Sequence, residues 1–349
     1  MKKQILAGVL SATMIVGMGG VSVFAADGAD DKTYNIGICQ LVQHEALDAA
    51  TQGFKDAITE ELGDKVTFDE QNAQGDSNTC STIITDFVSD NVDLILANAT
   101  PALQAAAAGT ADIPILGTSV TEYGVALDLD NFDGTVGGNI SGTSDLAPLE
   151  DQAAMLNELF PDAKNVGLVY CSAEANSQYQ VDTVKAALEK LGYTCEYYAF
   201  SDSNDLSSVA TTAATESDVI YLPTDNTVAS NTEIINNICL PEKVPVIAGE
   251  EGICEGCGVA TLSISYYDLG VATGKMALKV LVDGEDISKM PIEYAPQFTK
   301  EYNPEICKEL GIEVPDDYVA IGADAEEETS EDDADAADDT AEETTEEAE

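Results

Sequence analysis

Two short polar turns carry the side chains with the clearest potential to bind a small charged molecule. The first turn, residues 98–101, contains Thr100, and the second, residues 223–227, contains Asp225. Each turn directly follows a short apolar run, a pattern typical of a buried strand that leads into a loop at its carboxyl end. If the two turns face each other, the carboxylate and the hydroxyl suit the ammonium and carboxylate groups of a zwitterion.

Asp225 is the strongest single candidate, because a carboxylate in a closed cleft would accept charge-assisted hydrogen bonds from an ammonium group. The alternative is that Asp225 only caps the helix that follows it. Thr100 and Ser119 are expected where helices begin, so their hydroxyls and the nearby amides could hold a carboxylate or, again, serve as ordinary caps. The chain has no Arg, so a ligand carboxylate would have to be held in this way or by a Lys.

The remaining candidates share a place in predicted turns and a side chain that can form directed hydrogen bonds or stack on an aromatic ring. They are Gln40, His44, Asn72, Gln74, Tyr123, Asn176, Ser177, Asn226 and Glu250. His44 is the only histidine, and without a Ser elbow or a paired Cys it is more consistent with a helix start than with a general base. Phosphate-binding glycine motifs are absent from the sequence. These residues favour a binding protein that is not an enzyme and uses no cofactor.

Strand and helix patterns alternate in the same order twice along the chain. Residues 36–119 and 166–249 each read as four strand–helix units, and in each the first helix ends at a glycine, Gly63 or Gly192. The fourth strand of the first copy is predicted at residues 113–116. Such alternation predicts an α/β fold with two parallel sheets covered by helices on both faces. Ligands of open α/β sheets bind outside the carboxyl ends of the strands, so a cleft between the copies is expected.

The ends of the chain differ from this middle part in composition. Residues 1–25 predict a signal peptide, with Lys2 and Lys3 before an apolar stretch and small residues at the expected cleavage site. No cysteine lies near that site, so lipid attachment is not predicted. Residues 323–349 are only Ala, Asp, Glu, Thr and Ser, which predicts an acidic disordered tail. Between the signal peptide and the acidic tail we expect two lobes. One is formed by residues 33–146 plus about 266–290, and the other by residues 147–265 plus about 291–322.

Charge and cysteine content limit the partners. The chain has 65 acidic and 14 basic residues and a net charge of −51, which makes nucleic acid and anionic lipid poor partners. Eight cysteines are present, and their pairing cannot be fixed from sequence. Cys254 and Cys257 form a close pair in a predicted Gly-rich loop, for which we expect a local disulfide. Zinc is the less favoured alternative there, because one His and no second close Cys pair leave few ligands.

Six ordered blocks of the sequence resemble the ABC-transporter substrate-binding proteins related to tryptophan and tyrosine uptake. The family usually has Pro where this chain has Glu45. The blocks are residues 36–48, 72–76, 99–102, 174–177, 223–227 and 266–270.

The resemblance implies a type I periplasmic-binding-protein fold, with two Rossmann-like lobes, three crossovers and a ligand cleft at the hinge. It implies an exported monomer, extracellular or at the cell surface (periplasmic if an outer membrane is present), that delivers an amino acid, often an aromatic one, to an ABC permease. The alternative is a ligand sensor that presents the same cleft to a receptor or sensor kinase. The residues that the matching blocks place in the cleft are Gln40, Asn72, Thr100, Asn176, Ser177 and Asp225.

Overall fold

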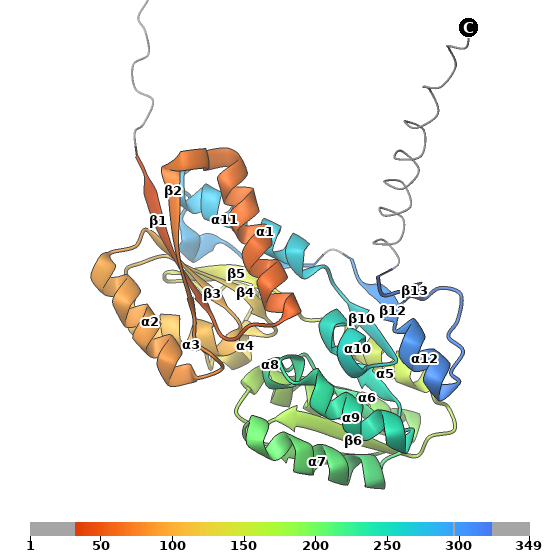
Figure 1. Ribbon diagram of the computed structural model, residues 1–349. Helices are drawn as coiled ribbons and strands as arrows, with labels where there is room; N and C mark the ends of the chain where they lie inside the picture. The colour runs from red at the N-terminus through yellow and green to blue at the C-terminus, as the bar shows by residue number, and fades with distance from the viewer. Residues whose placement is uncertain (1–31, 296, 323–349) are drawn as a thin grey trace, which may run out of the picture. The chain divides into compact units, whose positions relative to one another are not determined.

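The computed structural model describes residues 32–295 and 297–322, and the folded body that begins at Thr33 contains two α/β lobes, each built on one sheet (Figure 1). The predicted signal peptide and acidic tail lie outside the described residues. Among the residues described, no helix is both long and apolar enough to cross a membrane.

The first lobe is built on a six-stranded parallel sheet with the order β11-β5-β4-β3-β1-β2. Its strands alternate their side chains between two cores: Ile95 and Ala97 face one core, and Leu94 and Leu96 face the other. The strands are β1 (Tyr34–Gln40), β2 (Val66–Asn72), β3 (Leu94–Asn98), β4 (Ile115–Val120), β5 (Ile140–Ser144) and β11 (Glu293–Tyr294). The helices are α1 (Glu45–Leu62), α2 (Ser77–Asp90), α3 (Thr100–Gly109), α4 (Tyr123–Ala126) and α11 (Tyr266–Leu281), with 3-10 turns η1 (Gly63–Lys65) and η2 (Ile287–Lys289).

The second lobe has a seven-stranded sheet with the order β13-β12-β10-β9-β8-β6-β7, in which β12 runs antiparallel to β10. Its helices again cover both faces, with α5, α6 and α12 over one core and α7, α9 and α10 over the other. The strands are β6 (Asn165–Cys171), β7 (Thr194–Phe200), β8 (Val219–Leu222), β9 (Val246–Ala248), β10 (Ala260–Ser263), β12 (Thr299–Tyr302) and β13 (Val319–Ala320). The helices are α5 (Leu149–Leu159), α6 (Ala175–Leu191), α7 (Ser203–Glu216), α8 (Asn226–Ala229), α9 (Thr232–Glu242), α10 (Glu251–Cys257) and α12 (Pro304–Leu310).

The chain crosses between the sheets three times: after β5, after β10 and after β11. The second crossing brings α11 back beside α1 (Figure 1). The two helices touch through glycines, since a methyl group added to Gly270 would lie 2.0 Å from the carbonyl oxygen of Ala50, and one added to Gly53 would lie 2.1 Å from that of Tyr267. This close packing fastens a late segment of the chain to the first lobe.

The predicted alternation and the parallel sheets are confirmed, with three differences. Strand β4 continues to Val120 instead of ending at residue 116, and a register irregularity lies between Gly117 and Val120. Glu293 and Tyr294 pair with β5, so they belong to the first lobe, and the expected change of lobe near residue 291 is too early. Finally, β12 runs antiparallel to β10, whereas parallel sheets were predicted.

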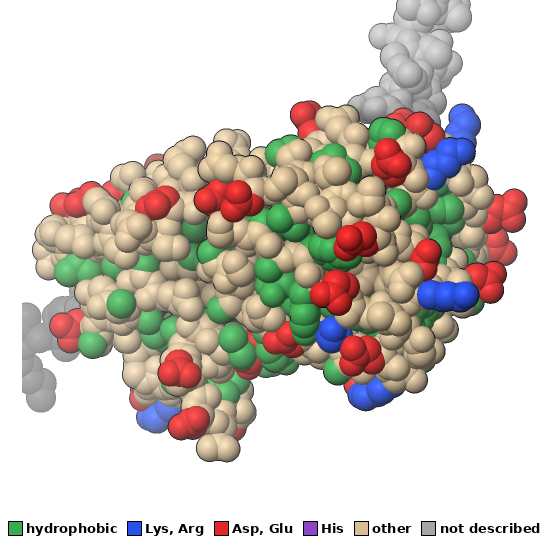
Figure 2. All heavy atoms as spheres, turned by 90° about the horizontal axis from the view of Figure 1, so that it is seen from below, with side chains coloured by type: hydrophobic (Ala, Val, Ile, Leu, Met, Phe, Trp, Pro, Cys, Tyr) green, Lys and Arg blue, Asp and Glu red, His purple; other side chains and the backbone are tan. Residues whose placement is uncertain are grey.

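The surface carries many carboxylates and few lysines. On the face shown in Figure 2, acidic side chains are dispersed, and the lysines lie among them without forming a basic patch. The seven ion pairs found among the described residues engage only part of the acidic surplus.

Candidate functional site

The candidate site lies where the carboxyl ends of the strands of both lobes meet. A hydrogen bond joins the lobes there, between Nε2 of His44 at the start of α1 and Oδ1 of Asn226 at the start of α8, 3.2 Å apart. Burial lowers the pKa of His44, against the opposing influence of Asn226 and nearby carboxylates. A cavity of about 230 Å³ opens beside this contact, lined by residues of the first lobe such as Gln74 and of the second such as Glu174.

Asp225 is buried and caps α8. Its Oδ2 accepts a hydrogen bond from the backbone N–H of Cys171 (2.7 Å), and its Oδ1 accepts one from that of Val228 (2.9 Å). Burial, followed by the charge of Glu174, raises the pKa of Asp225 to about 8, although both backbone bonds act in the opposite direction. The structure therefore shows the capping role that the sequence left as an alternative. A contact between Asp225 and a ligand ammonium group stays a prediction.

Glu174 holds the same turn and was not singled out from the sequence, although it lies in a matching block. Its Oε1 accepts hydrogen bonds from the backbone N–H and hydroxyl of Thr227 (2.9 and 2.8 Å). Its Oε2 accepts from the backbone N–H and side-chain amide of Asn226 (3.0 and 2.7 Å). Two buried carboxylates, Glu174 and Asp225, thus hold the turn from which Asn226 contacts His44.

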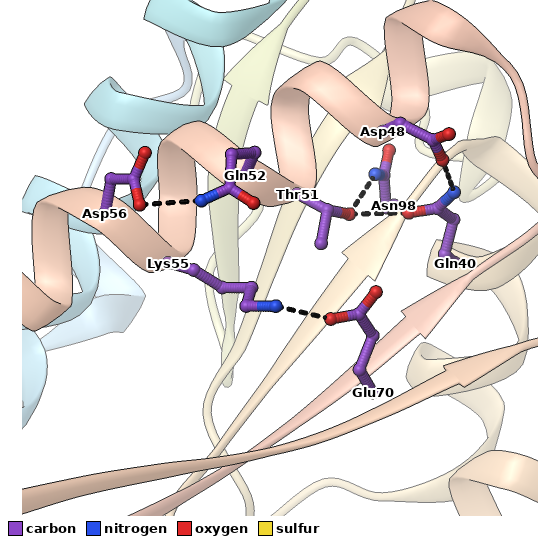
Figure 3. A network of polar contacts seen from close by, with 8 residues as sticks. All are labelled: Gln40, Asp48, Thr51, Gln52, Lys55, Asp56, Glu70 and Asn98. Carbon is purple, nitrogen blue, oxygen red and sulfur yellow. Dashed lines mark hydrogen bonds and ion pairs between the residues drawn. The ribbon is translucent and has the colours of Figure 1, made fainter.

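Gln40 is engaged in a network within the first lobe (Figure 3). Its Nε2 donates to Asp48 Oδ1 (2.6 Å), and its Oε1 accepts from the hydroxyl of Thr51 (2.7 Å). Asn98 donates to the same hydroxyl oxygen (2.9 Å) and to the carbonyl oxygen of Leu47 (2.8 Å). These bonds fasten the ends of β1 and β3 to α1, so Gln40 positions the first lobe's side of the site.

The ends of β3 and β4 contain two strained residues. Ala99 has φ 91° and ψ 158°, and Ser119 has φ 53°, backbone angles that residues other than glycine rarely adopt. Ser119 lies within β4 and not at a helix start as expected, and its buried Oγ has no hydrogen-bond partner. Thr100 is the first residue of α3, whose start no side chain caps. Strain and an unsatisfied hydroxyl together make this edge of the sheet a candidate binding position.

The second lobe contributes Asn176 and Ser177 at the start of α6, both buried. The side-chain amide of Asn176 donates to the carbonyl oxygen of Thr224 (3.0 Å), while its buried Oδ1 has no partner. Like the Ser119 hydroxyl in the first lobe, this oxygen is buried without a hydrogen-bond partner.

Three other predicted residues are placed differently. Tyr123 is 1% exposed and packs in the first lobe's core, where its hydroxyl donates to the carbonyl oxygen of Thr143 (3.0 Å), so it is not available for stacking on a ligand. Asn72 accepts from the backbone N–H of Gln74 (2.8 Å) and lines a cavity made by the first lobe alone. Gln74 is exposed and lines the cavity between the lobes.

Glu250 belongs to a group of carboxylates at the border of the two lobes. It caps α10 by accepting from the backbone N–H groups of Gly252 and Ile253 (2.8 and 2.7 Å), and burial raises its pKa to about 7. Burial and the neighbouring Glu255 likewise raise the pKa of Glu45, at the start of α1, to about 7. Glu45, Glu250 and Glu255 line one cavity between the start of α1 and α10.

Asp145 was not predicted from the sequence. It follows β5 at the first crossing, is 5% exposed, and accepts a hydrogen bond at Oδ2 from the hydroxyl of Tyr266 (3.1 Å), while its buried Oδ1 has no partner. Burial raises its pKa to about 6, against the opposing influence of the Thr121 and Tyr266 hydroxyls. Strand β5 was missed because it contains Ser141, Gly142, Thr143 and Ser144 in place of an apolar run, and so Asp145 was missed too.

The disulfide expected between Cys254 and Cys257 is wrong in this structure, where all eight cysteines are buried free thiols. The segment is helix α10 and not a loop, and both side chains pack into the second lobe's core. The Cys257 thiol donates to the carbonyl oxygen of Ile253 (3.3 Å). In the part of the chain described, no group of three or more His, Cys, Asp or Glu is arranged to hold a metal ion.

Comparisons with known proteins agree with this architecture. The family model of the ABC transporter substrate binding protein matches residues 35–326. The tyrosine-binding protein of Clostridioides difficile strain R20291 is 35% identical over 320 residues, covering 88% of this chain and 91% of that protein.

Two solved structures are similar over nearly their whole length. An ABC domain from Streptococcus pneumoniae in complex with L-Trp is 34% identical with a TM-score of 0.78, covering 82% of this chain and 97% of that one. A ligand-free, open structure of a Clostridium difficile substrate-binding protein with adhesive properties is 39% identical with a TM-score of 0.63, covering 82% and 99%. The fold is that of type I periplasmic binding proteins, which bind solutes and are not enzymes. By its matched length and its relatives, this chain belongs to the ABC transporter substrate-binding protein family.

Proposed function

We propose that this protein binds an aromatic amino acid, tyrosine or tryptophan, between its lobes and delivers it to the permease of an ABC importer. The observation that carries the proposal is the set of buried hydrogen-bonding atoms without partners at the strand ends of both lobes, namely Ser119 Oγ and Asn176 Oδ1. Buried polar atoms are nearly always satisfied in folded proteins, so such atoms in a binding protein indicate the positions of ligand groups. The tyrosine-binding relative and the L-Trp complex support the ligand class.

The ligand carboxylate fits the first lobe. The start of α3 has no side-chain cap, and Thr100 and Ser119 stand at the ends of neighbouring strands β3 and β4. Backbone N–H groups at a helix start attract a carboxylate, and the Ser119 hydroxyl can donate to it. The strain at Ala99 and Ser119 is consistent with a backbone shaped for a ligand and not for stability.

Ligand binding by lobe closure is supported by the two structural comparisons. The TM-score is higher with the L-Trp complex than with the open, ligand-free protein, although the latter is more similar in sequence. We infer that a difference in the angle between otherwise similar lobes causes this order. A ligand that contacts both lobes stabilises the closed form by its higher affinity for that form.

The cellular setting follows from the same proposal. The chain is exported by its signal peptide, acts as a monomer at the cell surface or outside the cell, and meets its permease in the closed, loaded form. The membership of the family and the composition of residues 1–25 support this setting.

Calorimetric titration of refolded, ligand-free protein with each of the twenty amino acids tests the proposal. We expect tyrosine or tryptophan to bind with a dissociation constant near 1 μM, about 8 kcal/mol of binding free energy. Ser119→Ala should weaken binding about tenfold by removing a hydrogen-bond donor. Ser208→Ala, at an exposed position on α7, is the matched control and should bind as the parent does. Failure of every aromatic amino acid to bind the parent protein would overturn the proposal.

A further inference from the structure

Asp145 occupies a special place in the fold, because it lies on the first crossing and contacts the second. It directly follows β5, and its partner Tyr266 is the first residue of α11, to which the chain returns from the second lobe. The carboxyl group is therefore held where the two lobes are connected, at the carboxyl end of the sheet. One of its oxygens, Oδ1, is buried without a hydrogen-bond partner.

A buried carboxylate needs a cation or donors to both of its oxygens, and the protein supplies Asp145 with no cation and leaves Oδ1 without a donor. Its side-chain contacts are hydroxyl groups, those of Tyr266 and Thr121, and Tyr123 lies nearby. None of the ion pairs in residues 32–295 and 297–322 includes Asp145, and the chain has no Arg. Burying a charge without a counter-ion is costly, so a positively charged ligand group can stabilise a site of this kind.

We infer that Asp145 accepts the ammonium group of the amino acid, through the oxygen that has no partner in the protein. The inference rests on the proposed function, and it moves the ammonium contact away from Asp225. Both oxygens of Asp225 already accept backbone N–H bonds, whereas Asp145 keeps one acceptor oxygen unused.

The position of Asp145 also matches the geometry of an α-amino acid. Strands β4 and β5 are neighbours, Val120 pairs with Ser144, and the backbone N–H of Asp145 donates to the carbonyl oxygen of Val120 (3.3 Å). Asp145 thus follows the strand next to the one that carries Ser119. The ammonium and carboxylate groups of an amino acid are bonded to one carbon atom, so the protein groups that bind them must be close neighbours. Ser119 and Asp145 stand at the ends of neighbouring strands of one sheet, as this requirement demands.

A thermodynamic cycle between the protein carboxylate and the ligand ammonium group tests the assignment. The dissociation constants of the parent and of Asp145→Asn are measured by calorimetry for tyrosine and for 3-(4-hydroxyphenyl)propionate, which lacks the amine. If tryptophan is the better ligand, indole-3-propionate replaces the second compound. We expect loss of the amine to weaken binding about 100-fold in the parent and less than about fivefold in Asp145→Asn. An equal effect of amine removal in both proteins would overturn the assignment.

Two further variants make the result decisive. Asp145→Ser carries the same expectation as Asp145→Asn, so a folding failure of one leaves the other as the test. Asp225→Asn is the rival variant, and amine removal should still weaken its binding as strongly as in the parent. Loss of the amine effect in Asp225→Asn would place the ammonium group there and refute our assignment. Absence of aromatic amino-acid binding by the parent would instead refute the proposed function itself.

Discussion

Replacement of Asp145 by Asn should stabilise the ligand-free protein near neutral pH. Burial raises the pKa of Asp145 from its usual 3.8 to about 6, so the folded state binds this proton more tightly than the unfolded state does. The stabilising effect of that proton is complete below about pH 3.8 and is lost as the pH rises through 6. Above pH 6 the buried charge lowers the free energy of unfolding by roughly 3 kcal/mol.

Asn is of the same size, carries no charge and can still accept the hydrogen bond from Tyr266. Its amide group leaves one buried N–H without a partner, which costs about 1 kcal/mol. We therefore expect Asp145→Asn to raise the free energy of unfolding by about 2 kcal/mol at about pH 8, and by less than about 1 kcal/mol at about pH 5.

Urea unfolding followed by circular dichroism at both pH values measures this difference, on protein freed of ligand by refolding. Ser208→Ala, at an exposed position on α7, is the control and should leave the free energy of unfolding unchanged at both pH values. The argument that the Asp145 charge is unpaired is refuted if Asp145→Asn is less stable than the parent at about pH 8. It is also refuted if the substitution raises the free energy of unfolding equally at both pH values.

Three other predictions follow from contacts described above. Burial and the neighbouring Glu255 of the other lobe raise the pKa of Glu45 to about 7, so we expect closure to be favoured below that pH and disfavoured above it. Calorimetry should show tighter ligand binding at about pH 6 than at about pH 8, and Glu45→Gln should remove most of that difference; an unchanged pH dependence would contradict it. Gly270→Ala should lower the free energy of unfolding by about 1–3 kcal/mol in urea, because its methyl group meets the Ala50 carbonyl; full stability would show that α1 and α11 are not so close. Thiol titration without reductant should find all eight cysteines reactive in denaturant and few reactive in the native protein. A count of only six reactive thiols in denaturant would indicate that one disulfide is present.

Much of the fold could be predicted because buried parallel strands are short apolar runs and their helices have one apolar face. Strands β3 and β8, the apolar runs before the two polar turns, are examples of elements that this pattern located. Strand β5 escaped because Ser141, Thr143 and Ser144 make it polar, although all three are fully buried. Polar side chains that hydrogen-bond inside a protein look like loop residues in a sequence.

The candidate site was harder to predict than the fold. The residue type of Asp225 fits a cap and a ligand contact equally well, and only its two backbone bonds separate these roles. The left-handed backbone of Ser119 is set by the irregularity in β4 and not by serine itself, so no sequence signal announces it. The burial of Tyr123 depends on Gly117 and Gly142, where added methyl groups would lie 2.4 and 2.5 Å from its hydroxyl oxygen.

The return of α11 to α1 has a consequence for the order in which the protein can fold. A nascent chain that ends near residue 265 already contains β10 but still lacks α11, so the core that α1 shares with the first sheet still lacks Met276 and Ala277. The second sheet is completed even later in synthesis, because its strands β12 and β13 come from the last described segment. Contacts this distant in sequence form slowly and late. Neither lobe can mature on its own during synthesis, and both become complete only when nearly the whole chain is available.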